Sequence, residues 1–142
     1  MSVSHILGVK GRSVVTGTAK ETVQSIAQKL SQHRIGAVVI VDDKEAIAGI
    51  VSERDYARKV ILLGRSSSDT PVWQIMSSPV KTVSPDADVH QCMEIMTEMR
   101  IRHLPVIDKN RLVGMISIGD LVKAVIEEQQ QTITQLERYI AG

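Results

Sequence analysis

GIVSERD (residues 49–55) and GMISIGD (residues 114–120) carry the same pattern, Gly-x-x-Ser-x-x-Asp. Each copy ends an apolar run with the composition of a strand, and each precedes a stretch with helical periodicity. A short pattern that recurs in the same context indicates an internal duplication, and a duplication determines the fold more than any single element does.

The duplication extends over a longer unit. Residues 14–43 align with residues 80–109, so that Asp42 corresponds to Asp108. In each copy a helix, a β-rich run, a polar turn, a second apolar run and another helix follow in the same order. Because each half alone is small for a stable core, the sequence predicts an α/β protein of the α+β type. We expect two β-α-β-β-α repeats, packed as a pseudo-twofold module.

Periodicity and capping signals predict the individual elements. A capping box of Thr18 and Glu21 opens the first helix, and Ser84 followed by Pro85 opens its counterpart. The predicted strands are 37–41, 47–52, 103–107 and 112–117, and the predicted second helices are 53–63 and 118–130.

The same signals predict the domain organisation. The boundaries are 1–64 for the first repeat, 65–71 for a linker, 72–130 for the second repeat and 131–142 for a helical tail. In this tail Ile133, Leu136 and Ile140 recur at helical spacing and form an apolar stripe. The stripe either packs on its own domain or forms a dimer contact.

Composition and charge exclude several classes of protein. Apolar residues make up 43% of the chain and charged residues 23%, which is typical of a globular protein. A net charge of +1 argues against a nucleic-acid partner, and no apolar run approaches the roughly 20 residues of a membrane span. With a single cysteine there is no internal disulfide, so a reducing cytoplasm is expected. His5, His33 and His90 lack a paired metal-ligand spacing, and the sequence predicts no metal site.

The Gly-Ser-Asp pattern has a structural interpretation and a functional one. Ser52 with Asp55, and Ser117 with Asp120, have the spacing of a capping box. A capping box leaves the glycine unexplained, because a glycine inside a strand marks close approach by a backbone or a ligand. Functionally, amides at a helix start and a serine hydroxyl suit phosphate, and a carboxylate accepts hydrogen bonds from ribose hydroxyls. The pattern therefore predicts a nucleoside phosphate site that needs no catalytic group.

These motifs, with VWQIMSSPVKTVSPDADV (72–89) and MRIRHLPVID (99–108), resemble those of paired CBS (cystathionine-β-synthase) domains, known as a Bateman module. The resemblance covers nearly all of residues 6–127. It implies adenine nucleotides (AMP, ADP, ATP, NAD or S-adenosylmethionine) bound in clefts between the repeats. It also implies regulation rather than catalysis, and dimerisation into a flat disc.

The resemblance further implies that each cleft draws on both repeats. The first cleft is assigned Ile50, Ser52, Arg54, Asp55, Val80, Lys81, Arg102 and His103. The second is assigned Met115, Ser117, Asp120, Val15, Thr16, Gly36 and Ala37. The first cleft is the more basic, so the tighter or more phosphorylated ligand is expected there. Gly36 stands where the second repeat has Arg102. The segment before the first repeat is longer than the one before the second, and its Lys10 and Arg12 are candidates to replace that cation.

Other conspicuous side chains are interpreted as structural. Cys92 is expected to be a buried, inert thiol, and Met93, Met96 and Met99 are expected in the core. For His103, a structural role and a phosphate contact both remain open.

The sequence therefore predicts a cytoplasmic adenine-nucleotide sensor that is not an enzyme and has no catalytic cofactor. It is expected to act as a homodimer or on an unidentified protein partner, without nucleic acid or membrane. Two alternatives remain open, a ligand-free structural or dimerisation module and an S-adenosylmethionine sensor. A nucleotide-handling enzyme is disfavoured, because no nucleophile and base form a recognisable set.

Overall fold

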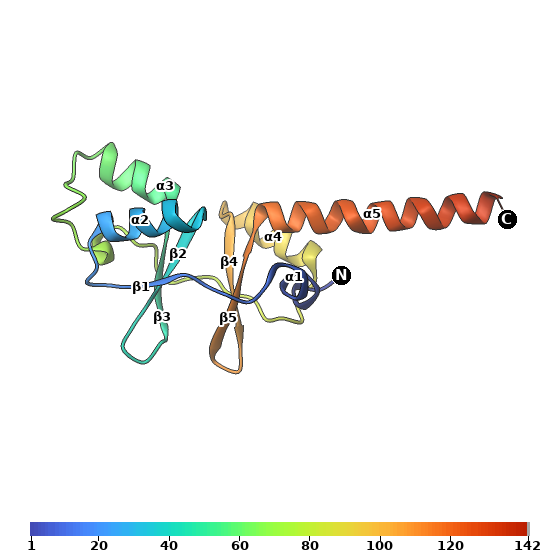
Figure 1. Cartoon of the computed structure of the whole chain (residues 1–142), viewed down its shortest axis with the longest axis horizontal. Coiled ribbons are helices and arrows are strands. Elements are labelled where there is room, and N and C mark those ends of the chain that lie inside the picture. The colour runs from blue at the N-terminus through green and yellow to red at the C-terminus, as the bar shows by residue number, and fades with distance from the viewer. Residues whose placement is uncertain (142) are drawn as a thin grey trace. The chain divides into compact units, whose positions relative to one another are not determined.

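A computed structural model describes residues 1–141 of the chain (Figure 1). The elements are α1 (Val3–Lys10), β1 (Thr16–Thr18), α2 (Val23–His33), β2 (Ala37–Val41), β3 (Ile47–Ser52), α3 (Glu53–Tyr56), α4 (Val89–Met99), β4 (His103–Asp108), β5 (Arg111–Ser117) and α5 (Ile118–Ala141). The α+β class is confirmed, and each of the four predicted strands is present with its limits shifted by at most one residue.

The chain divides into two compact units, which we describe separately. The first unit comprises residues 13–81 and 109–112, and the second comprises residues 1–12, 82–108 and 113–141. The first twelve residues are thus found in the unit of the second repeat, whereas the predicted boundaries assign them to the first repeat. The reason lies in how the segment before each repeat is packed.

The strands pair as the alternation of apolar residues indicates. In the first repeat β1 runs parallel to β2, and β2 runs antiparallel to β3, with Ala37 opposite Ser52. In the second repeat β4 and β5 form a hairpin, and Val83 makes a parallel bridge to Val106 where the first repeat has β1. The two Gly-Ser-Asp motifs lie at the junctions where β3 and β5 end.

Equivalent helices bury equivalent positions in the two cores. On α2 and α4 the core residues recur at spacings of three and four, as the periodicity predicts. They are Val23, Ile26 and Leu30 in the first repeat, and Val89, Cys92 and Met96 in the second. Cys92 is fully buried as predicted, and burial raises the pKa of its thiol. The predicted methionine stripe is wrong at its end, because Met99 is the last residue of α4 and is exposed.

A lead-in segment precedes each repeat, and each segment packs into the core of the unit that holds the other repeat's strands. We define the lead-in segments as residues 3–10 and 72–77. Their buried side chains share one spacing, with Val3, Ile6 and Leu7 in the second unit and Val72, Ile75 and the partly buried Met76 in the first. Residues from outside a repeat therefore complete its core.

The two strand glycines accommodate these lead-in side chains. A Cβ atom at Gly114 would lie 2.6 Å from Leu7 Cδ2, and one at Gly49 would lie 2.5 Å from Met76 Sδ. Neither distance leaves room for a larger residue without movement of the neighbour. Close approach at both glycines is confirmed, but the approaching group is a packed side chain rather than a ligand or a backbone.

Both predicted helix caps are wrong, and for the same reason. Thr22 rather than Thr18 caps α2, by accepting the Ser25 N–H at 3.1 Å. Asp88 rather than Ser84 caps α4, by accepting the His90 N–H at 3.0 Å.

The lead-in segments form hydrogen bonds with the backbone just before each of these helices. The carbonyls of Ala19 and Glu21 accept N–H groups of residues 73 and 72, at 3.2 and 2.7 Å. The carbonyls of Pro85 and Ala87 accept N–H groups of residues 4 and 3, both at 2.9 Å. Because these residues bond to a distant segment in a non-helical conformation, each helix begins later than local signals indicate.

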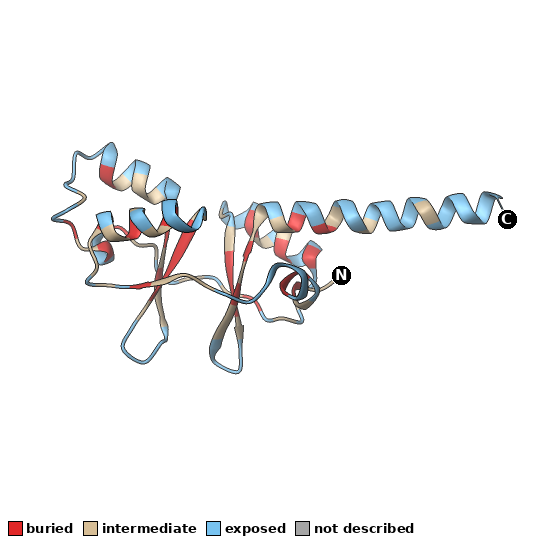
Figure 2. Ribbon diagram, viewed as in Figure 1, coloured by how far each residue is buried: buried red, intermediate tan, exposed pale blue. Residues whose placement is uncertain are grey.

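The helices that follow the two motifs differ. In the first repeat, α3 continues as a π-helical turn, Ala57–Ile61, across most of the predicted range 53–63. In the second repeat, the predicted helix 118–130 and the predicted tail form one continuous helix, α5. The tail does not pack on its own domain in the described part of the chain, since Leu136 and Ile140 remain 57% and 83% exposed. Figure 2 shows most of this end of α5 as exposed. Gly142, the last residue of the predicted tail, lies outside the described residues.

Candidate functional site

The first Ser–Asp pair lies where β3 ends and α3 begins. The Asp55 N–H donates to Ser52 Oγ at 3.2 Å, and the Ser52 N–H donates to Asp55 Oδ2 at 2.9 Å. These reciprocal bonds form a complete capping box. The structural interpretation of the motif is therefore confirmed for this pair.

Other polar groups surround the Asp55 carboxylate. Lys59 Nζ lies 3.1 Å from Asp55 Oδ1, and Ser77 Oγ donates to the same oxygen at 3.4 Å. Ser52 Oγ donates to Oδ2 at 3.2 Å, in addition to the Ser52 N–H. The side chain of Asp55 is only 14% exposed. A carboxylate offers about four acceptor sites, so a ligand hydroxyl that bonds to Oδ1 must replace Lys59 or Ser77.

The second Ser–Asp pair repeats this arrangement at the end of β5. The Ser117 N–H donates to Asp120 Oδ2 at 2.9 Å, and the Asp120 N–H donates to Ser117 Oγ at 3.2 Å. Lys10 of α1 donates to Asp120 Oδ2 at 2.6 Å and to the Met115 carbonyl at 2.8 Å. Lys10, one of the two cations predicted for the second cleft, thus contacts the aspartate of that set, and its role toward a ligand stays a prediction.

Each aspartate therefore has one lysine, but the two lysines come from different parts of the chain. Lys59 follows Asp55 by four residues on the same helical segment, and this spacing could have identified it from the sequence. Lys10 belongs to a lead-in segment, and its contact depends on the tertiary packing of α1. Sequence reasoning missed Lys59 and Ser77, and Ser77 gave no local signal.

The Lys10 contact gives the second pair a pH dependence. Partial burial alone would raise the pKa of Asp120, but hydrogen bonds from Lys10 and from Ser117 outweigh it and leave the pKa below its ordinary value. The unfolded chain then binds more protons than the folded chain in acid. The stabilisation is complete above the ordinary pKa, about 4, and is lost as the pH falls through the lower pKa of the folded state.

We expect Lys10→Met to weaken this acid-dependent loss of stability. The free energy of unfolding of the variant should be lower than that of wild type near neutral pH, and the difference should shrink below about pH 4. Urea unfolding between pH 7 and pH 2.5 measures it, with Lys20→Met, at an exposed site in the first unit, as the charge-matched control. A difference between Lys10→Met and wild type that does not change with pH would contradict the assigned ion pair.

Gly36, assigned to the second cleft, and Arg102, assigned to the first, each lie beside the Ser–Asp pair of their own repeat. The Glu53 N–H donates to the Gly36 carbonyl at 3.0 Å, next to the first pair. The Ile118 N–H donates to the Arg102 carbonyl at 2.9 Å, next to the second. Their assignment to the opposite pair stays a prediction.

The remaining predicted residues are distributed over both units. Ile50 exchanges backbone hydrogen bonds with Ser77 at 3.1 and 2.9 Å, and so joins β3 to a lead-in segment. The first unit also contains half-buried Val15, Thr16 and Val80, buried Ala37, and exposed Arg54 and Lys81. Half-buried Met115 and His103 belong to the second unit.

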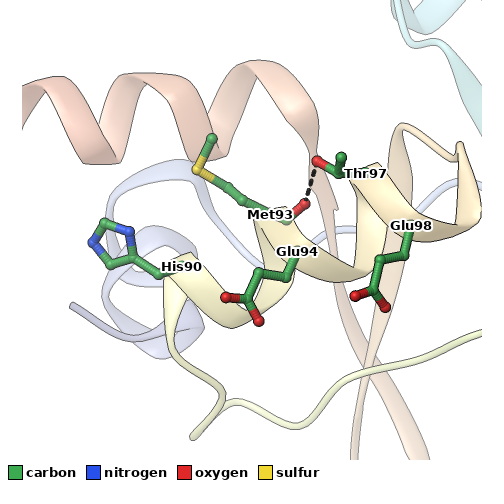
Figure 3. A pocket seen from close by; sticks show the side chains of 5 residues that line it. All are labelled: His90, Met93, Glu94, Thr97 and Glu98. Carbon is green, nitrogen blue, oxygen red and sulfur yellow. Dashed lines mark hydrogen bonds between the residues drawn. The ribbon is translucent and has the colours of Figure 1, made fainter.

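A shallow pocket lies on α4 (Figure 3). It is lined by His90, Met93, Glu94, Thr97 and Glu98. All five belong to one helix, so the pocket has no opposing wall of its own. His90 Nε2 lies 3.0 Å from Glu128 Oε1, and this hydrogen bond raises the pKa of the imidazole. Within residues 1–141 no cluster of His, Cys, Asp or Glu is arranged to hold a metal ion.

Two copies of one α+β unit, each with a Ser–Asp capping box where a strand meets a helix, define a tandem-repeat domain protein. The CBS domain family model matches residues 8–62 and 72–127, and the chain belongs to this family. The resemblance stated from the motifs is confirmed.

Relatives share this organisation over most of their length. The mitochondrial CBS domain-containing protein CBSX3 of Arabidopsis thaliana is 41% identical over 99% of this chain and 72% of its own. A putative signal-transduction protein with CBS domains from Burkholderia ambifaria has a TM-score of 0.86 and 47% identity, over 91% of this chain and 96% of its own. A CBS domain protein from Pyrobaculum aerophilum, complexed with AMP, has a TM-score of 0.80 and 29% identity, over 92% of this chain and 99% of its own.

None of the helices within residues 1–141 combines the length and the apolar character needed to cross a bilayer.

Proposed function

We propose that this chain is a regulatory module that binds an adenine nucleotide (AMP, ADP, ATP or NAD) at its Ser–Asp pairs. One observation carries the proposal: each junction holds an aspartate fixed by a capping box, with a lysine within 3.1 Å of its carboxylate. The AMP complex of the Pyrobaculum aerophilum relative supports the same class of ligand.

The chemistry of the first pair suits a ribose phosphate. Asp55 accepts the two ribose hydroxyls through a carboxylate that the capping box already orients. Lys59 then leaves Oδ1 and turns to the phosphate, so that its charge remains paired. Adenosine has no phosphate for Lys59, and we therefore expect AMP to bind more tightly than adenosine.

The second pair offers the same groups with Lys10 in place of Lys59. A ribose on Asp120 would release Lys10 from a hydrogen bond of 2.6 Å, and the phosphate would again receive the freed ammonium group. Both sites are proposed to carry one cation each, and the stronger basic character expected for the first site rests on Arg54, Lys81 and Arg102.

Further contacts to the base and the phosphate are proposed for the remaining residues of the two predicted sets. For the first site these are Ile50, Val80, Lys81, Arg102 and His103, and for the second they are Val15, Thr16, Gly36, Ala37 and Met115. The proposal includes binding without turnover, in line with the predicted regulatory role. A response to the ligand requires that it bind one arrangement of the protein better than another, and a homodimer or a protein partner would transmit it. A cytoplasmic location stays a prediction.

A thermal-shift screen tests the proposal. Purified full-length chain is heated with AMP, ADP, ATP, NAD, S-adenosylmethionine or adenosine, each at several concentrations. A ligand at 100 times its Kd is expected to add about 2.7 kcal/mol to the free energy of unfolding. Stabilisation by none of them would favour a ligand-free structural module, and stabilisation by S-adenosylmethionine alone would favour that sensor. Chromatography after prolonged incubation with ATP or NAD checks that the nucleotide is recovered unchanged.

A further inference from the structure

An exposed apolar stripe runs along α5, and Figure 2 shows most of the distal part of this helix as exposed. The members of the stripe are Val122 (43% exposed), Ile126 (60%), Ile133 (47%), Leu136 (57%) and Ile140 (83%). The face of α5 that packs into the second unit is a different one, with Leu121 and Ala124 buried. Residues on an α-helix are about 100° apart, so Val122 points about a quarter turn away from Leu121.

The stripe has the spacing of a coiled-coil seam. Residues 122, 126, 129, 133, 136 and 140 follow one another at alternating steps of four and three, with Gln129 as the only polar member. Apolar residues at a and d of a heptad repeat pack against the same positions of a second helix. The seam runs for about 27 Å at 1.5 Å per residue, and a single chain leaves it facing solvent.

We propose that this stripe binds the same stripe of a second copy of the chain, with the two helices antiparallel and centred on residue 131. In this register a and d positions face each other in mirrored pairs, 122 with 140, 126 with 136 and 129 with 133. Every member of the seam then meets a member of the partner's seam, and neither helix end is left unpaired.

Charge complementarity favours the antiparallel arrangement. The flanking e positions are Lys123, Gln130 and Glu137, and e positions face e positions in an antiparallel pair. Lys123 then faces the partner's Glu137, and symmetry provides the same ion pair a second time. In a parallel pair e positions face g positions, so Lys123 and Glu137 would face residues equivalent to Ile118 and Thr132 and lose both ion pairs.

Sedimentation equilibrium of the full-length chain tests the interface. Wild type is expected to self-associate, and Ile133→Lys with Leu136→Lys is expected to raise the dissociation constant about 100-fold or more, since two apolar anchors are replaced by charges in each chain. The control is Gln131→Lys with Gln135→Lys, which adds the same charge on the opposite face of α5 and should keep the wild-type constant. Circular dichroism confirms that both variants are folded. A monomeric wild type, or equal constants for the two variants, would overturn the proposal.

A charge swap tests the orientation. Lys123→Glu and Glu137→Lys should each raise the dissociation constant about tenfold at low salt, because each creates two like-charge pairs. Combining the two changes should restore it. The positions are 14 residues, or about 21 Å, apart on one helix, so restoration must pass through the partner. If the effects of the two changes simply add in the double variant, the helices are not paired in this way. The same follows if 1 M salt leaves the effects on the dissociation constant unchanged.

Discussion

Replacing Leu7 with alanine is expected to destabilise the protein by about 2–5 kcal/mol, the cost of removing a fully buried leucine. Leu7 is 1% exposed in the second unit, and its methyl groups fill the space that the absent side chain of Gly114 leaves. The matched control is Val9→Ala on the same helix, because Val9 is 74% exposed. Urea unfolding measures both variants, and the control should lie within about 0.5 kcal/mol of wild type.

Hydrogen exchange locates the loss caused by Leu7→Ala. Amide protection should fall first in β4 at Leu104 and Val106, which share the core cluster of Leu7. Protection in β2 at Val38 and Ile40 belongs to the other cluster and should fall less. A uniform decrease in both clusters, or a variant as stable as the Val9→Ala control, would contradict the assigned role of the first lead-in segment.

Asp55→Asn is expected to weaken AMP binding by about 10- to 100-fold, since hydrogen bonds to a charged acceptor contribute about 1.5–3 kcal/mol. Ser52 remains the N-cap, and the amide oxygen of asparagine can still accept the Ser52 N–H, so the junction is expected to stay folded. Isothermal titration calorimetry measures the affinity, and Asp120→Asn reports on the second site in the same way. This prediction rests on the proposed function, whereas the Leu7→Ala prediction rests on packing alone.

The matched control for Asp55→Asn is Glu53→Gln. Glu53 lies on the same short helix, is exposed, and loses the same charge. Its AMP affinity should stay within about twofold of wild type, because a surface charge contributes little. If Asp55→Asn is folded and binds AMP as tightly as this control does, the carboxylate does not hold the ribose, and the motif serves only as a capping box.

The two Ser–Asp pairs show how much of a site can be predicted from its sequence. The pairs themselves, their place at strand-to-helix junctions and their capping geometry follow from a three-residue spacing, which local backbone geometry enforces. Lys59 follows from a four-residue helical spacing. Lys10 and Ser77 reach the aspartates from lead-in segments, 110 and 22 residues away along the chain, and no local rule predicts such contacts.

The duplication, the strands and the buried faces of α2 and α4 follow from local sequence patterns. Each of these depends on the period of apolar residues, and a period of two or of 3.6 residues is a local property of the backbone. Tertiary packing sets where those helices begin, what approaches Gly49 and Gly114, and that the tail of α5 leaves its own domain. Each of these features depends on a segment that is distant in the sequence. Such a segment bonds to the backbone carbonyls before a helix or fills the space beside a glycine. Where none packs, as along the tail of α5, apolar surface stays exposed. The spacing of residues along the chain does not indicate which distant segment makes the contact.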